Sequence, residues 1–110
     1  MNLALELNTA HMNVYSAISI PGTSLFYEAK DRGWVPPEDY RDYAFLSYET
    51  NQSPTKYVSA RDVLAFRDSF WKTYFTNPEY LALVEKKFGK KQKDNVVRLS
   101  NIELKRRLLE

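Results

Sequence analysis

The sequence predicts a mainly helical chain with one or two short strands, in other words a fragment of α/β type. Apolar side chains recur at helical spacing across residues 63–74. Residues that cap helices stand at several expected boundaries, among them Thr23, Asn77-Pro78 and Gly89. One uncharged run, residues 14–20, has instead the composition of a strand. Helix therefore dominates the expected structure.

The predicted strand covers residues 14–20. Both of its faces carry apolar or small uncharged side chains, which is typical of a strand covered on both sides. Pro21 has no N–H to donate and Gly22 allows a sharp turn, so the strand should end there. A single strand leaves its backbone groups unpaired. We therefore expect it to pair with another segment of this chain, a second copy or another domain.

Two short helices flank this strand. The first lies in a leucine-rich segment, residues 3–7, and Asn8-Thr9 should end it. It begins without a cap or a lead-in, which indicates that the chain continues upstream. The second covers residues 24–32, with Thr23 as N-cap and Gly33 as the left-handed residue that stops it.

A long loop is predicted for residues 34–58. Pro36-Pro37 enforces an extended backbone, and the segment rich in tyrosine and aspartate after it follows neither a period of 2 nor one of 3.6. We expect one helical turn within it, and residues 56–58 are the candidate second strand. Two interpretations of its aromatic side chains are open, a lid over a pocket or a strap that packs on the core.

Three further helices are predicted in the second half. A partial capping box opens the first of them, over residues 59–75, which carries a broad aromatic face. A residue pair typical of N-cap and N1 opens the second, and Gly89 should end it. The expected starts are Ser59, Asn77, and Asp94 or Asn95, and the apolar stripes are Val63-Phe66-Phe70-Tyr74, Leu81-Val84-Phe88 and Val97-Leu104-Leu108.

Composition limits the chemistry that the chain can perform. A chain of 110 residues with 44% hydrophobic residues suffices for one folded core. It contains no cysteine, which excludes disulfides, thiolate metal sites and thiol nucleophiles within it. The single histidine, His11, should be a loop or strand-start residue. We find neither a run long enough to span a membrane nor a signal-peptide pattern, so we expect a cytoplasmic protein.

Charge is distributed unevenly along the chain. Residues 1–85 carry 7 Lys and Arg against 11 Asp and Glu, whereas residues 86–110 carry 9 against 3. The basic end could bind an acidic partner, a phosphate or a nucleic acid. The simpler explanation is a solvated helix face, because no aromatic residue follows Phe88 to stack on bases.

Two runs together resemble a known family, the radical S-adenosylmethionine (SAM) enzymes that carry an N-terminal cobalamin-binding domain. The end of the barrel in that family has the pattern N-F-Y-x-A-M-x-Y-P-G-T-P-L-Y. In this chain the similar run is Asn13-Val-Tyr15-Ser-Ala17-Ile-Ser19-Ile20-Pro21-Gly22-Thr23-Ser24-Leu25-Phe, preceded by Asn8-Thr9. The helical tail after that barrel is similar to Tyr57-Val-Ser59, Leu64, Phe66-Arg67-Asp68, Tyr74-Phe75, Asn77-Pro78, Tyr80-Leu81 and Lys87-Phe88-Gly89.

Two departures from the family pattern matter. Ser24 replaces a frequent second proline, and Ser19-Ile20 stands where proline or alanine and then tyrosine are common. The C-x3-C-x2-C motif that holds the [4Fe–4S] cluster in the family is absent. The resemblance therefore implies a C-terminal segment of a larger enzyme.

The resemblance implies three parts: the end of the barrel at residues 1–33 (helix, strand, helix), an aromatic loop at residues 34–58 and a C-terminal helical region at residues 59–110. It places the [4Fe–4S] cluster, SAM and, in some members, cobalamin outside this chain. In the family the last strand and the following loop lie beside the adenine of SAM. The residues that carry over as adenine contacts are Ala17, Ile18, Ser19, Ile20, Gly22 and Thr23, and none carries over as a catalytic residue or a metal ligand.

The implied function is the C-terminal part of an Fe–S oxidoreductase of this radical SAM type. Such a segment would be inactive alone and would help to complete the SAM and substrate pocket, with the N-terminal remainder of the enzyme as its partner. Two other hypotheses stay open. One is a free-standing interaction module that presents the aromatic face of residues 59–75, and the other is nucleic-acid binding through the basic C-terminus.

Overall fold

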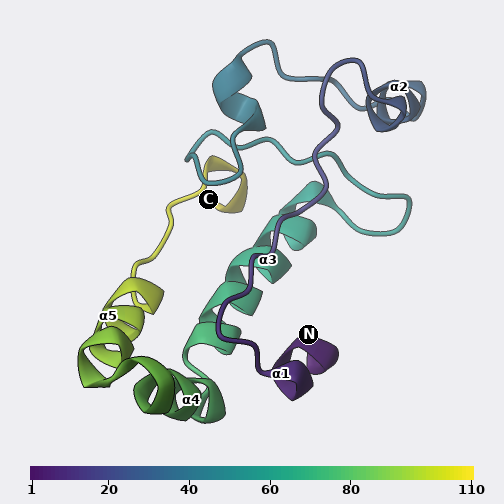
Figure 1. Ribbon diagram of the computed structural model, residues 1–110. Helices are drawn as coiled ribbons and strands as arrows, with labels where there is room; N and C mark the ends of the chain where they lie inside the picture. The colour runs from purple at the N-terminus through teal and green to yellow at the C-terminus, as the bar shows by residue number, and fades with distance from the viewer. The chain divides into compact units, whose positions relative to one another are not determined.

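The computed structural model describes all residues 1–110 and contains five α-helices, two short 3-10 helices and no strand (Figure 1). The elements are α1 (Asn2–Leu7), α2 (Ser24–Asp31), η1 (Tyr40–Tyr43), α3 (Ala60–Phe75), α4 (Pro78–Phe88), α5 (Lys90–Ser100) and η2 (Arg107–Leu109). They fall into two compact units. Unit 1 comprises residues 1–14 and 68–103, and unit 2 comprises residues 15–67 and 104–110. None of the helices is both long enough and apolar enough to span a membrane.

The predicted fold class is wrong, because all the regular secondary structure of the chain is helical and it contains no strand. Residues 14–20, expected to be the last strand of a barrel, form no ladder with any other segment. Within them the N–H of Ile20 donates to the carbonyl of Ile18 at 2.9 Å, which closes a three-residue turn at Ser19. Residues 56–58 are not a strand either, since the N–H of Thr55 donates to the carbonyl of Val58 in a tight turn. Apolar composition without a partner segment does not make a sheet.

The helices before the loop begin and end where the sequence predicts. Asn8 ends α1 in the left-handed region with a φ of 42°. Thr23 caps α2, since its hydroxyl oxygen accepts from the N–H of Phe26 at 3.2 Å. Gly33, with a φ of 88°, follows the end of α2. The single helical turn expected in the loop is η1.

Local caps also begin α3 and α4. The Ser59 hydroxyl accepts from the N–H of Asp62 at 3.1 Å and donates to its carboxylate at 2.7 Å. The Asn77 side-chain oxygen accepts from the N–H of Glu79 at 2.9 Å, ahead of Pro78 in the first turn of α4. Both starts were predicted, because each cap bond joins residues no more than three positions apart.

The predicted last helix is misplaced. α5 begins at Lys90, not at Asp94 or Asn95, and it ends at Ser100, so Leu104 and Leu108 of the expected stripe lie outside it. Gly89, with a φ of 86°, both ends α4 and precedes α5. One glycine therefore turns the chain directly from one helix into the next, and no linker is needed.

The core of unit 1 is built on aromatic rings. Its fully buried members are Phe70, Tyr74, Phe75, Tyr80 and Val84, and α1 packs against them through Ala4 and Leu5. α4 and α5 pack against each other. Three residues of the predicted stripes are instead exposed, Phe66 with 55%, Phe88 with 57% and Leu104 with 42% of their surface accessible. Phe70 and Tyr74 are buried, so the predicted aromatic face is not exposed as a whole.

Two tyrosine hydroxyls attach the segment after α1 to this core. The hydroxyl of Tyr74 donates to the carbonyl of Thr9 at 2.7 Å, and that of Tyr80 donates to the carbonyl of Ala10 at 3.2 Å. Burial raises the pKa of Tyr80, and the neighbouring Tyr74 hydroxyl adds to the effect. Since the segment has no ladder, these bonds satisfy carbonyls that would otherwise lack a donor.

Replacing Tyr74 by phenylalanine tests this attachment. Y74F keeps the ring in the core but removes the donor to Thr9, so the free energy of unfolding of unit 1 should fall by about 1–2 kcal/mol. Urea unfolding followed by the fluorescence of Trp71, which packs against this core, measures the change. The control is Y27F, because the side chain of Tyr27 is 58% exposed. Equal unfolding midpoints for the two variants would contradict the proposed role of the hydroxyl.

Candidate functional site

The six residues carried over as adenine contacts divide into a buried and an exposed set. Ile18 and Ser19 are buried, with 7% and 0% of their surface accessible. The remaining four, Ala17, Ile20, Gly22 and Thr23, are exposed. Only the exposed set can contact a molecule on the surface of unit 2.

The four exposed residues are uncharged and precede α2 in the sequence. The hydroxyl of Thr23 is occupied in capping, since it accepts from the N–H of Phe26 and donates to the carbonyl of Ile20 at 2.7 Å. Gly22 has a φ of 88°, and a Cβ added there would meet no atom within 4 Å. The backbone conformation therefore requires glycine at this position, and the space beside it is open to a planar group.

Beneath this surface lies a buried polar cluster that the sequence did not predict. The hydroxyl of Ser19 donates to the hydroxyl of Ser53 at 2.8 Å. The Gln52 amide nitrogen donates to the Thr50 hydroxyl at 3.0 Å, whereas its amide oxygen is buried without a donor. The only available signal was a short run of uncharged polar residues, 50–53, inside an otherwise charged and aromatic loop. Ser19 therefore anchors the loop instead of facing a ligand.

Replacing Ser19 by alanine tests this assignment. S19A leaves the Ser53 hydroxyl buried without its partner, so the free energy of unfolding of unit 2 should fall by about 1 kcal/mol. The fluorescence of Trp34, which lies in unit 2, follows the transition. S16A is the matched control in the same segment, and its midpoint should equal that of the parent chain. Unchanged stability in S19A would show that the bond does not anchor the loop.

The loop after α2 is held by its own aromatic side chains. The hydroxyl of Tyr43 donates to the carbonyl of Pro37 at 3.3 Å, and burial raises the pKa of this tyrosine. The ring of Phe45 lies 5.0 Å from that of Tyr15, in a tilted arrangement. Tyr40, by contrast, is 85% exposed. Some rings thus act as a strap, whereas Tyr40 and Tyr57, each 85% exposed, lie at the surface.

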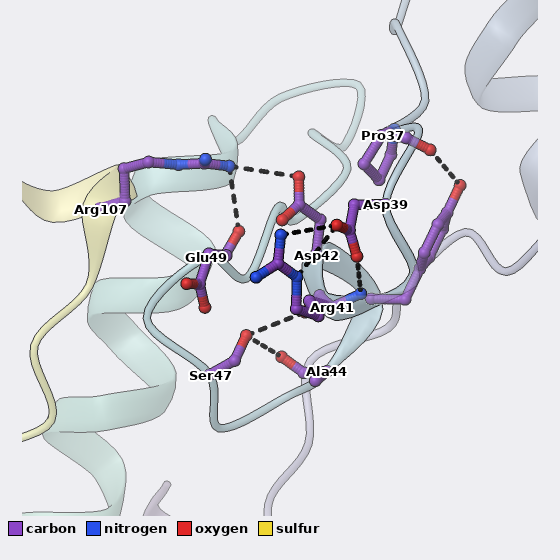
Figure 2. A network of polar contacts seen from close by, with 9 residues as sticks. Pro37, Asp39, Arg41, Asp42, Ala44, Ser47, Glu49 and Arg107 are labelled. Carbon is purple, nitrogen blue, oxygen red and sulfur yellow. Dashed lines mark hydrogen bonds and ion pairs between the residues drawn. The ribbon is translucent and has the colours of Figure 1, made fainter.

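The C-terminal segment, residues 104–110, binds the main chain of this loop. Arg106 is 2% exposed, and its guanidinium donates to the carbonyls of Phe45 and Ser47 at 3.2 and 2.9 Å. Figure 2 shows the neighbouring Arg107, which donates to the carbonyl of Glu49 at 3.2 Å and to the carboxylate of Asp42 at 3.3 Å. These donors replace the ladder bonds that an irregular loop lacks.

Further bonds fix the C-terminal end of the same segment. The guanidinium of Arg61 donates to the carbonyls of Leu108 and Leu109 at 3.1 and 2.7 Å. The hydroxyl of Tyr48 donates to the Glu110 carboxylate at 2.6 Å, and this bond raises the pKa of Tyr48. We refer to residues 104–110 with these partners as the C-terminal clasp.

A separate ion pair shapes the turn η1. The Asp39 carboxylate accepts three bonds from Arg41, one from its backbone N–H at 2.8 Å and two from its guanidinium at 2.9 and 2.7 Å (Figure 2). The guanidinium bonds, followed by the backbone bond, hold the pKa of Asp39 below its ordinary value. The pair is solvent-exposed, so its contribution to stability is small.

The Tyr48–Glu110 bond has a testable pH dependence. Because the pKa of Tyr48 is raised in the folded chain, the bond contributes below the ordinary tyrosine pKa and is lost as the pH rises through the raised one. E110Q should lower the Tyr48 pKa, and E103Q, which removes an exposed carboxylate from unit 1, should not. The Tyr48 pKa in each variant is measured by following the NMR shifts of the tyrosine ring carbons as the pH is raised. An unchanged Tyr48 pKa in E110Q would exclude the bond.

A cavity of about 410 Å³ opens in unit 2 near the end of α2. Two cations, Arg32 and Lys56, border it together with the ring of Trp34. Arg32 also pairs with Glu28, one turn earlier in α2. None of the six predicted contacts lines this cavity, and no group of three or more His, Cys, Asp or Glu side chains lies close enough together to hold a metal ion.

The two cofactors that the resemblance implies, the Fe–S cluster and SAM, place different requirements on the residues of this chain. An Fe–S cluster needs thiolate ligands, and a chain without cysteine does not supply them. The open space beside Gly22 leaves room for a ligand but supplies no contact to one, and Ile18 and Ser19 are too deeply buried to touch an adenine. Comparison of the chain with protein-family models, with curated proteins and with solved structures finds no match.

Proposed function

We propose that this chain is the C-terminal part of a radical SAM enzyme of the cobalamin-binding-domain type, an Fe–S oxidoreductase of the cytoplasm. It performs no chemistry alone, and it contributes one wall of the pocket for SAM and substrate. The wall consists of the exposed residues Ala17, Ile20, Gly22 and Thr23. Its partner is the N-terminal remainder of the same enzyme.

The observation that carries this proposal is the uncharged surface before α2. It offers backbone and small side chains, with no side chain near Gly22 to obstruct a flat ligand. Four of the residues that share the family pattern in order, Ala17, Pro21, Gly22 and Thr23, lie in this one short segment. A purine can be recognised by such a surface through shape and apolar contact, with few polar groups.

Exposed apolar side chains give independent support for a large partner. Unit 2 leaves many of its large apolar and aromatic residues accessible, and a partner that covers them would bury apolar surface. They are Tyr15, Ile20, Leu25, Tyr27, Val35, Tyr40, Leu46, Tyr48, Tyr57, Val58, Phe66 and Leu104, each at least 41% exposed. A further domain of the same polypeptide is the partner that the proposal assigns to them.

The side chains present indicate which part of the reaction this chain would serve and which part the cofactors would supply. Bound SAM and its cluster would supply the radical chemistry, with every thiolate ligand from outside these residues. This chain's own part is to hold Gly22 at a positive φ, to keep the Thr23 hydroxyl in its cap and to fix the loop through the clasp. Positioning of this kind contributes to rate by orienting the reactants.

Two glycines with the same backbone angle allow a matched test. Gly22 and Gly33 both have a φ of 88°, and neither has an atom within 4 Å of an added Cβ. Asparagine tolerates this region of φ and adds a polar side chain. In the full-length enzyme, prepared without oxygen, G22N should weaken SAM binding about tenfold, or 1.4 kcal/mol. G33N carries the same backbone cost away from the proposed wall and should leave SAM affinity unchanged.

Equilibrium dialysis with SAM measures the affinities, and urea unfolding confirms that both variants fold. Equal SAM affinities for G22N and G33N would show that Gly22 does not line the SAM pocket. The family assignment would not be affected by that result. The family assignment itself fails if the full-length protein has no three closely spaced cysteines, or if it forms no [4Fe–4S] cluster detectable by electron paramagnetic resonance after reduction.

A further inference from the structure

The corner between α4 and α5 in unit 1 combines positive charge with an exposed aromatic ring. Lys86 and Lys87 lie in the last turn of α4, and Lys90 and Lys91 open α5. All four lysines are exposed, and Phe88 stands between the two pairs. We refer to these five residues as the basic corner.

The charge of the basic corner is not neutralised within the chain. None of its four lysines forms an ion pair. The nearest carboxylate in sequence, Glu85, accepts instead from Lys93 at 2.6 Å. Residues 85–98 hold six cations against two carboxylates, so a net positive potential remains at the surface.

The lysines at the start of α5 are unfavourable for the helix, because they place positive charge in its first turn. The first turn of a helix favours acidic residues, because its free N–H groups carry partial positive charge. α5 has no acidic residue in its first turn and no side-chain cap. Lys90 and Lys91 therefore add to the positive end of the helix, an arrangement that costs stability and suits the binding of anions.

Phe88 departs from the apolar stripe of its own helix. Val84, one turn earlier, is 2% exposed in the core, whereas Phe88 is 57% exposed. Gly89 turns the chain at this point, so the stripe runs past the edge of the core into solvent. The outcome is a single exposed ring that lies in the sequence between two pairs of exposed lysines.

We propose that the basic corner docks on the surface of an anionic phospholipid bilayer. The lysines neutralise lipid phosphates, and the ring of Phe88 enters the layer between headgroups and acyl chains. Basic residues around an exposed aromatic side chain are the combination by which peripheral segments bind such surfaces. The inference does not depend on the function proposed above.

Nucleic acid would share the attraction to phosphate, but the corner lacks its other requirements. Binding of single strands needs several aromatic platforms, and Phe88 is alone. Arginine suits directed phosphate contacts, yet the only arginine of α5, Arg98, donates to the side chain of Asn95 at 2.8 Å. Flexible lysine stems fit a diffuse layer of headgroups better.

Flotation of the full 110-residue chain with vesicles tests the proposal. Vesicles of phosphatidylcholine with about one-third phosphatidylglycerol should bind the chain, and vesicles of phosphatidylcholine alone should not. K87E/K90E should reduce binding at least about tenfold. F88S should reduce it about fivefold without any change of charge. Binding should also weaken as salt is raised, since screening shortens the range of the attraction.

The matched control is K56E/K72E, which changes the net charge equally through two exposed lysines outside the corner. Circular dichroism establishes that each variant keeps its helices. Equal losses in the two double variants would overturn the proposal, because binding would then follow net charge alone. Unchanged binding in F88S, tighter binding to a DNA duplex or an RNA strand than to vesicles at equal salt, or no vesicle binding at low salt would also overturn it.

Discussion

The whole structure depends on side-chain donors that bond to main-chain carbonyls of irregular segments. A chain without a sheet must satisfy those carbonyls in some other way, because an unpaired buried carbonyl is costly. In unit 1 the donors are the hydroxyls of Tyr74 and Tyr80, and in unit 2 they are the guanidiniums of Arg61, Arg106 and Arg107. Each donor lies far along the sequence from its acceptor, so these bonds fix the tertiary structure as ladder bonds would.

The same constraint explains which polar residues are buried. Arg106 is nearly inaccessible, and its guanidinium donates to the carbonyl of Phe45 and shares the carbonyl of Ser47 with the N–H of Thr50. Ser19 and Gln52 are buried for a related reason, since they bond to hydroxyls of the loop. The cost of desolvating these groups is offset only while the bonds persist. The loop is therefore expected to stay ordered only while the C-terminal segment remains bound to it.

The surfaces left over define what the chain can do. Neutral backbone before α2, apolar rings around unit 2 and lysines around Phe88 are three chemically distinct surfaces. We propose a flat ligand for the first, a protein domain for the second and an anionic layer for the third.

Sequence determined the helix starts at Ser24, Ala60 and Pro78, because their caps act within three residues. It also determined the absence of thiolate chemistry and the basic C-terminal charge. The strand predicted at residues 14–20 does not form, since pairing is a property of two segments and composition describes only one. Only the tertiary structure decided that Arg106 is buried, that Phe88 is exposed and that Ser19 faces the loop, because burial depends on what packs against a side chain from elsewhere in the chain.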